Sequence, residues 1–164
     1  AIRDDNPVLF FEDKMMYNDI GPVPEADDPI PFGQAEIKRI GSDVTLVATS
    51  SMVGICLKAA DILAADGIEA EVVDPLTLVP LDKETLVQSV RKTGYAVVVD
   101  EGVQRFGVTG ELASMLSIEA FDYLDAPIAR IGAAEVPVPF SPPLELPTIP
   151  NEERVAETVR TLRS

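Results

Sequence analysis

Residues 96–116, AVVVDEGVQRFGVTGELASML, hold a strand, a turn and the start of a helix in one continuous stretch. An apolar block comes first, followed by the acid pair Asp100 and Glu101, a loop that contains three glycines, and a helical pattern from about residue 108. A short apolar run of this kind is typical of a strand that is covered on both faces. The stretch therefore predicts one βα unit of an α/β fold.

The alternation of apolar strands and amphipathic helices extends along most of the chain. We expect strands at 34–40 (an edge strand), 43–49, 68–74, 95–101 and 127–132, and helices at about 52–65, 82–93, from 108 onward and at 151–163. Ser50 or Ser51, Asp82 and Asn151 are the expected N-caps, and Gly67 and Gly94 the expected terminators. The order predicts a three-layer α/β domain with a mostly parallel or mixed sheet of about five strands.

The N-terminal part has a different character. Residues 7–12, PVLFFE, are interpreted as a short buried strand, and the segment 21–33, rich in proline and glycine, as an extended connector. With 164 residues, of which 46% are hydrophobic, the chain can build one buried core. We therefore expect one domain with an arm.

Composition excludes several classes of function. The chain contains no histidine, so histidine-based triads and histidine metal ligation are absent from it. Its net charge of −15 disfavours nucleic acid and anionic lipid, and no apolar run is long enough for a membrane span. A single cysteine, Cys56, excludes an internal disulfide and is expected to lie buried in a helix. The composition predicts a soluble, intracellular protein.

Ligands of α/β sheets gather beyond the carboxyl ends of the strands, so the loops that follow the strands are the candidate site. The loop after residue 101 has neither nucleotide-binding glycine pattern, and we expect its glycines to be structural and Phe106 to fill the core. Ser50 and Ser51 can hold an anion or cap the helix that follows, and we favour capping. Asp100 and Glu101 are either acid–base groups, if burial raises a pKa, or solvated acids. A non-catalytic module that binds a small anion therefore stays open as an alternative.

Several ordered motifs resemble a known family. AIRDDNPVLFFEDKMMY, GSDVTLVATSSMV, VVVDEGVQRFGVTGELAS and VPVPFSPPLE, with the segments between them, resemble the C-terminal part of the beta subunit of the decarboxylating component of 2-oxo acid dehydrogenase complexes. The resemblance implies a transketolase C-terminal-like domain at 34–164 and, at 1–33, an arm and connector from a missing upstream domain. It favours the pyruvate or acetoin type, although Asp13 and Ser51 stand where members often carry histidine and arginine.

The resemblance also implies partners, cofactors and site residues. The family uses thiamine diphosphate and magnesium, which this chain is not expected to bind, so the chain alone is expected to be inactive. The implied partners are the alpha subunit, a second beta subunit and the lipoyl acyltransferase core. Potassium is implied at Ala1, Asp4 and Asn6, and contact with the basic acyltransferase at Glu119, Asp122 and Asp125. The implied location is the cytoplasm, or the mitochondrial matrix in a eukaryote.

Overall fold

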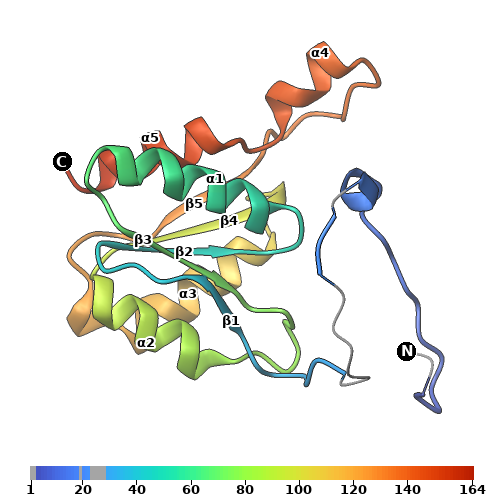
Figure 1. Cartoon of the computed structure of the whole chain (residues 1–164), viewed down its shortest axis with the longest axis horizontal. Helices are drawn as coiled ribbons and strands as arrows, with labels where there is room; N and C mark the ends of the chain where they lie inside the picture. Colours follow the sequence, from blue (N-terminus) through green and yellow to red (C-terminus); the bar gives the residue numbers. More distant parts are fainter. Residues whose placement is uncertain (1–2, 19, 23–28) are drawn as a thin grey trace.

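The computed structural model describes residues 3–18, 20–22 and 29–164. This part of the chain forms a five-stranded sheet with the order β1-β3-β2-β4-β5 (Figure 1). The strands are β1 (Glu36–Arg39), β2 (Val44–Ala48), β3 (Ala70–Asp74), β4 (Ala96–Val103) and β5 (Ala129–Ala133). β1 pairs antiparallel with β3 at one edge, and the other neighbouring strands are parallel. The expected mostly parallel sheet is confirmed, and its mixed character comes from β1.

Two pairs of helices cover the faces of the sheet (Figure 1). They are α1 (Met52–Ala65) with α5 (Glu152–Leu162) on one face and α2 (Lys83–Thr93) with α3 (Val108–Glu119) on the other. Successive side chains of a strand point to opposite faces, so Leu46 packs in the core under α1 and α5 while Val47 packs under α2 and α3. Both are fully buried, which explains why the strands are apolar at consecutive positions.

The sequence predicted the strands and the long helices well but missed the short helical elements. The bounds of α1 match the expected helix at 52–65, and Cys56 lies buried within it, where burial raises the pKa of the thiol to about 12. The elements without a sequence prediction are η1 (Lys14–Asn18), η2 (Phe121–Tyr123), α4 (Pro142–Glu145) and η3 (Leu146–Thr148). They are one or two turns long, so they contain too few residues for a periodic apolar pattern.

The expected helix ends are confirmed at α2 and α5. The Asp82 side chain accepts a hydrogen bond from the Thr85 amide, and the Asn151 side chain accepts one from the Arg154 amide. Gly94 ends α2 in the left-handed region, with φ of 73°, where an L side chain would be strained. These local signals decide where α2 begins and ends and where α5 begins.

Two expectations about apolar residues are wrong. Residues 7–12 form no strand, and Leu9 and Phe11 are 83% and 87% exposed, because no neighbouring strand pairs with them in the described part of the chain. Phe106 does not fill the core but is fully exposed. Its backbone has φ of 57°, and the inner face of α3 is filled by Leu112 and Leu116 instead.

The carboxylate of Asp82 generates a prediction about pH. Burial opposes its charge, but hydrogen bonds from the Ala35 amide, the Thr85 hydroxyl and the Thr85 amide outweigh burial and lower the pKa of Asp82 from its ordinary value of 3.8. A depressed pKa contributes stability that is present above the unfolded-state value and is lost as the pH falls through the folded-state value. We expect the stability advantage of the wild type over Asp82→Ser to be full near neutral pH and to shrink below pH 3.8.

Urea unfolding at about pH 7 and about pH 3 measures this difference. Serine keeps a capping hydroxyl, so helix capping is largely retained. The control is Asn151→Ser, which changes the cap of α5 without a titrating group and should show the same difference at both pH values. If the difference in unfolding free energy between the wild type and Asp82→Ser does not change with pH, the lowered pKa assigned to Asp82 is wrong.

Candidate functional surfaces

Four side chains tie together the loops at the carboxyl ends of β2 and β4. The Thr49 hydroxyl donates to Asp100 Oδ2 at 2.5 Å, and the Ser51 hydroxyl donates to Glu101 Oε2 at 2.9 Å. The expected capping by serine is wrong, because Ser51 occupies the N-cap position of α1 without a side-chain capping bond. Charged carboxylates are stronger acceptor partners than neutral groups, and here they engage the hydroxyls.

The charges in this cluster do not favour an anion. Two carboxylates stand beside the hydroxyls, and their negative charge repels an anion. In the residues that the structure describes, no three histidine, cysteine, aspartate or glutamate side chains come together as metal ligands. The Gly102 amide also donates to Asp100 Oδ1 at 2.9 Å, so the acids hold the loops in place.

The glycine loop before α3 has the structural role expected of it. A Cβ at Gly107 would lie 2.2 Å from the Val103 carbonyl oxygen, so a side chain at this position would force the backbone apart. Gly107 therefore allows α3 to begin close to the end of β4. Nothing in this geometry requires a phosphate.

The three acids expected to face a basic partner lie at the end of α3 and in the turn that follows. Glu119 pairs with Lys83 Nζ at 2.8 Å, and this hydrogen bond, with the charges of Lys83 and Arg91, lowers the pKa of Glu119. Asp122 and Asp125 are exposed on the same turn. The nearby Ile118 and Phe121 are 74% and 73% exposed, so the surface combines negative charge with apolar area.

The implied potassium ligands are only partly described. Ala1 lies outside the described residues. The Asn6 amide and side-chain nitrogen donate to Asp4 Oδ1 at 2.8 and 2.9 Å, and these bonds lower the pKa of Asp4. The potassium site stays a prediction.

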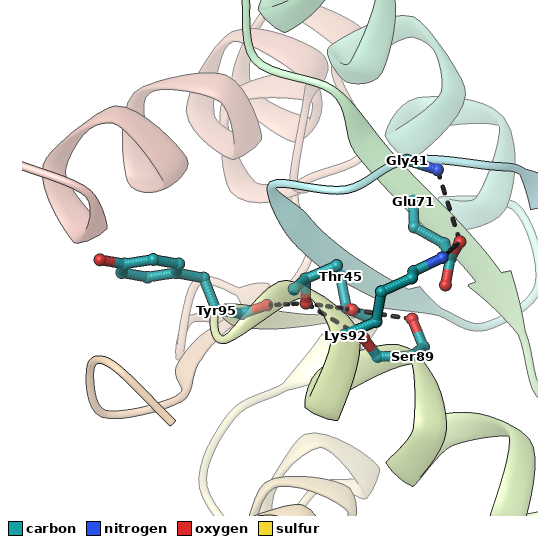
Figure 2. A network of polar contacts seen from close by, with 7 residues as sticks. Gly41, Thr45, Glu71, Ser89, Lys92 and Tyr95 are labelled. Carbon is teal, nitrogen blue, oxygen red and sulfur yellow. Dashed lines mark hydrogen bonds and ion pairs between the residues drawn. The ribbon is translucent and has the colours of Figure 1, made fainter. Parts of the chain in front are cut away.

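The buried polar network between the sheet and α2 escaped the sequence reasoning (Figure 2). Glu71, on β3, is fully buried, and its Oε2 binds Lys92 Nζ and accepts from the Gly41 amide at 3.4 Å. The adjacent Thr45 hydroxyl lies 2.8 Å from the Ser89 hydroxyl. Oε1 of Glu71 has no hydrogen-bond partner in the described structure. Lys92 is thus the cation that compensates a carboxylate inside the core.

One signal in the sequence could have revealed this network. Glu71 and Val73 are two positions apart on β3 and therefore point to the same face, which α2 covers. A glutamate at such a position requires a cation from the covering helix. Lys92 stands in the last turn of that helix, where a basic side chain also interacts favourably with the helix dipole.

The fold and these surfaces define a class: a three-layer α/β domain whose acids and hydroxyls hold its own loops and helices together. The family model "Transketolase, C-terminal domain" matches residues 33–155, and the chain belongs to this family.

The beta subunit of pyruvate dehydrogenase E1 from Rickettsia felis is 48% identical over 98% of this chain and 49% of its own length. The beta subunit of acetoin:2,6-dichlorophenolindophenol oxidoreductase from Bacillus subtilis is 45% identical over 99% of the chain and 47% of its own. The chain thus spans about half the length of these relatives. Their names confirm the resemblance to the C-terminal domain of such a beta subunit.

A solved structure supports the same family. The chain titled "Split gene transketolase, inactive beta4 tetramer" superimposes with a TM-score of 0.67 at 31% identity, over 87% of this chain and 45% of that one. This match agrees with the observed sheet order and helix layers and confirms the expected transketolase C-terminal-like fold.

The Glu71–Lys92 pair gives a prediction about stability. Replacing Lys92 with methionine leaves the fully buried carboxylate of Glu71 without its cation, and we expect a loss of about 2–3 kcal/mol in the free energy of unfolding. The double variant Glu71→Met/Lys92→Met should recover most of this loss, because an apolar pair needs no compensation. Urea unfolding measures both effects.

The matched control is Lys83→Met, which breaks the exposed Lys83–Glu119 pair. Exposed pairs contribute little, so a loss below about 1 kcal/mol is expected. Equal losses of unfolding free energy in Lys92→Met and Lys83→Met would show that burial of Glu71 does not make its pair with Lys92 contribute more than an exposed pair.

Proposed function

We propose that this chain is the C-terminal scaffold of a beta subunit in a thiamine diphosphate-dependent 2-oxo acid dehydrogenase component. It supports oxidative decarboxylation of pyruvate, or acetoin cleavage, with transfer of the acyl group to a lipoyl arm. The observation that carries the proposal is the identity of 48% and 45%, over nearly the whole chain, to beta subunits named for pyruvate dehydrogenase E1 and for acetoin:2,6-dichlorophenolindophenol oxidoreductase.

The cofactors do not fit the described residues. A diphosphate with magnesium needs a cradle of backbone amides or basic groups and hard oxygen ligands. The loops at the carboxyl ends of the strands instead present Asp100 and Glu101, whose oxygens accept bonds from the neighbouring loop, and no metal-ligand cluster is found in the described ranges. We therefore assign thiamine diphosphate and magnesium to other parts of the assembly, and this chain supplies position rather than catalytic groups.

The exposed apolar surface supports a role in assembly. Large apolar side chains are strongly exposed on the arm, on the loops after β3 and β4, and in the segment before α4: Leu9, Phe10, Phe11, Val79, Phe106, Val138 and Phe140. Such a set is larger than the isolated apolar residues normal for a monomer surface. We propose that these residues are covered by the upstream domain to which residues 1–33 belong, by the alpha subunit and by a second beta subunit.

The acidic turn fits the remaining partner. Asp122 and Asp125 offer negative charge beside exposed apolar residues, which suits a basic segment of the acyltransferase core and steers its approach. The potassium site at Ala1, Asp4 and Asn6 belongs to the same proposal. The assembly would work in the cytoplasm of a bacterium or in the mitochondrial matrix of a eukaryote.

The first test is catalytic. The purified chain should show no decarboxylation of pyruvate and no calorimetric heat with thiamine diphosphate, because the described residues present no groups suited to either. Adding the chain to the alpha subunit and the upstream half of the beta subunit should restore turnover. Turnover by the chain alone would overturn the scaffold assignment, and heat on titration with phosphate alone would favour an anion-binding module.

The second test concerns association. We expect a homodimer by sedimentation and binding to the acyltransferase that weakens as salt rises. Asp122→Asn/Asp125→Asn should weaken that binding by about tenfold at low salt, as expected for removal of two steering charges. The control Glu153→Gln, on α5, should leave it unchanged. A monomer at high micromolar concentration would contradict the first expectation, and binding independent of salt the second.

A further inference from the structure

The connector meets the domain at the loop between β3 and α2. The Gly33 amide donates to the Thr77 hydroxyl at 2.9 Å, and the Ala35 amide donates to Asp82 Oδ2 at 2.9 Å. The Thr77 hydroxyl in turn donates to the Pro80 carbonyl oxygen at 2.7 Å. Thr77 and Asp82, which both lie between β3 and α2, thus hold the backbone amides of Gly33, at the end of the connector, and Ala35, just after it.

Asp82 performs two tasks with one carboxylate. Its Oδ1 accepts from the Thr85 amide at 3.1 Å and caps α2, while Oδ2 accepts from the Thr85 hydroxyl at 2.7 Å and from Ala35. The position of the connector is therefore coupled to the first turn of α2. If the connector moved away, Oδ2 of Asp82 would lose the hydrogen bond from the Ala35 amide and would be exposed to water.

Gly33 is shaped for this contact. Its φ of +75° is strained for other residues, and a Cβ there would lie 3.2 Å from Pro80 Cγ. Among residues 29–33, the described end of the connector, Ile30 and Phe32 are 67% and 77% exposed and lie N-terminal to this glycine. The attachment to the domain therefore begins at Gly33.

We propose that Gly33, Ala35, Thr77 and Asp82 form a connector clamp, which fixes where the arm leaves the domain and places the hinge between arm and domain N-terminal to Gly33. The clamp holds the point where the arm leaves the domain at the carboxyl end of β3, beside the loop that leads into α2 (Figure 1). The exit of the chain at residues 29–33 is then fixed at this end of the sheet, whether or not the scaffold function is correct.

The two hydrogen bonds should act together, because Gly33 and Ala35 are separated by one residue and their acceptors belong to one loop. Thr77→Val removes the acceptor of Gly33 without a change of shape. Asp82→Ser keeps a capping hydroxyl for α2 but is too short to reach Ala35. Each bond corresponds to roughly a tenfold change in the opening equilibrium.

Amide hydrogen exchange, resolved by NMR on the intact chain, tests the clamp. In either variant, exchange at both Gly33 and Ala35 should rise about tenfold, because opening of one bond releases the other. In Thr77→Val, which leaves the cap of α2 in place, the amides of α5 should be unaffected. Thr158→Val and Asn151→Ser, which alter a hydroxyl and a cap on α5, should leave Gly33 and Ala35 unchanged.

A rise only at the amide that lost its acceptor would overturn the clamp and leave two independent hydrogen bonds. Unchanged exchange at both amides would also overturn it. If Asp82→Ser unfolds the domain, seen as loss of protection in α5, Thr77→Val still decides, because it does not touch the cap of α2. In the wild type, backbone order measured by ¹⁵N relaxation should rise at Gly33; order that is uniform from residue 29 to 35 would contradict the position of the hinge.

Discussion

The rest of the structure depends on the burial of β2, β3 and β4 on both faces. The buried positions of these strands are mostly apolar because α1 and α5 cover one face and α2 and α3 the other. Truncation of a residue such as Leu46, which is fully buried, would cost about 2–5 kcal/mol. This constraint explains both the order of the elements and the location of Glu71, the one acid buried among the described residues, whose partner must come from a covering helix.

The same constraint leaves the edges and ends of the sheet for other contacts. At the carboxyl ends, Thr49 and Ser51 donate to Asp100 and Glu101, so the polar side chains stabilise the loops and do not converge on an open site. The apolar side chains that the core does not need, such as Phe106 and Phe140, are exposed there or nearby. The proposed scaffold role rests on these exposed side chains and on the similarity of the chain to about half the length of two beta subunits.

The sequence alone predicts the layers of the fold, but it does not predict which apolar residues are exposed on the surface. Strand and helix periods, with Asp82 and Asn151 as caps, act locally and could be recognised directly. The apolar character of Phe106 and of residues 7–12 predicts an interior position, but their exposure depends on contacts between residues far apart in the sequence, which a local pattern does not contain. The bond from Ser51 to Glu101 joins residues 50 positions apart, so no capping rule could reveal it.

Native-state hydrogen exchange in increasing urea tests most directly the claim that two-sided burial makes residues 34–164 one cooperative unit. The amides of Leu46 in β2 and Val98 in β4 should exchange only through global unfolding, with a free energy and a urea dependence equal to those of the whole domain. Exchange of either strand through a local opening that urea does not affect, at a rate close to that of the exposed arm, would contradict the account.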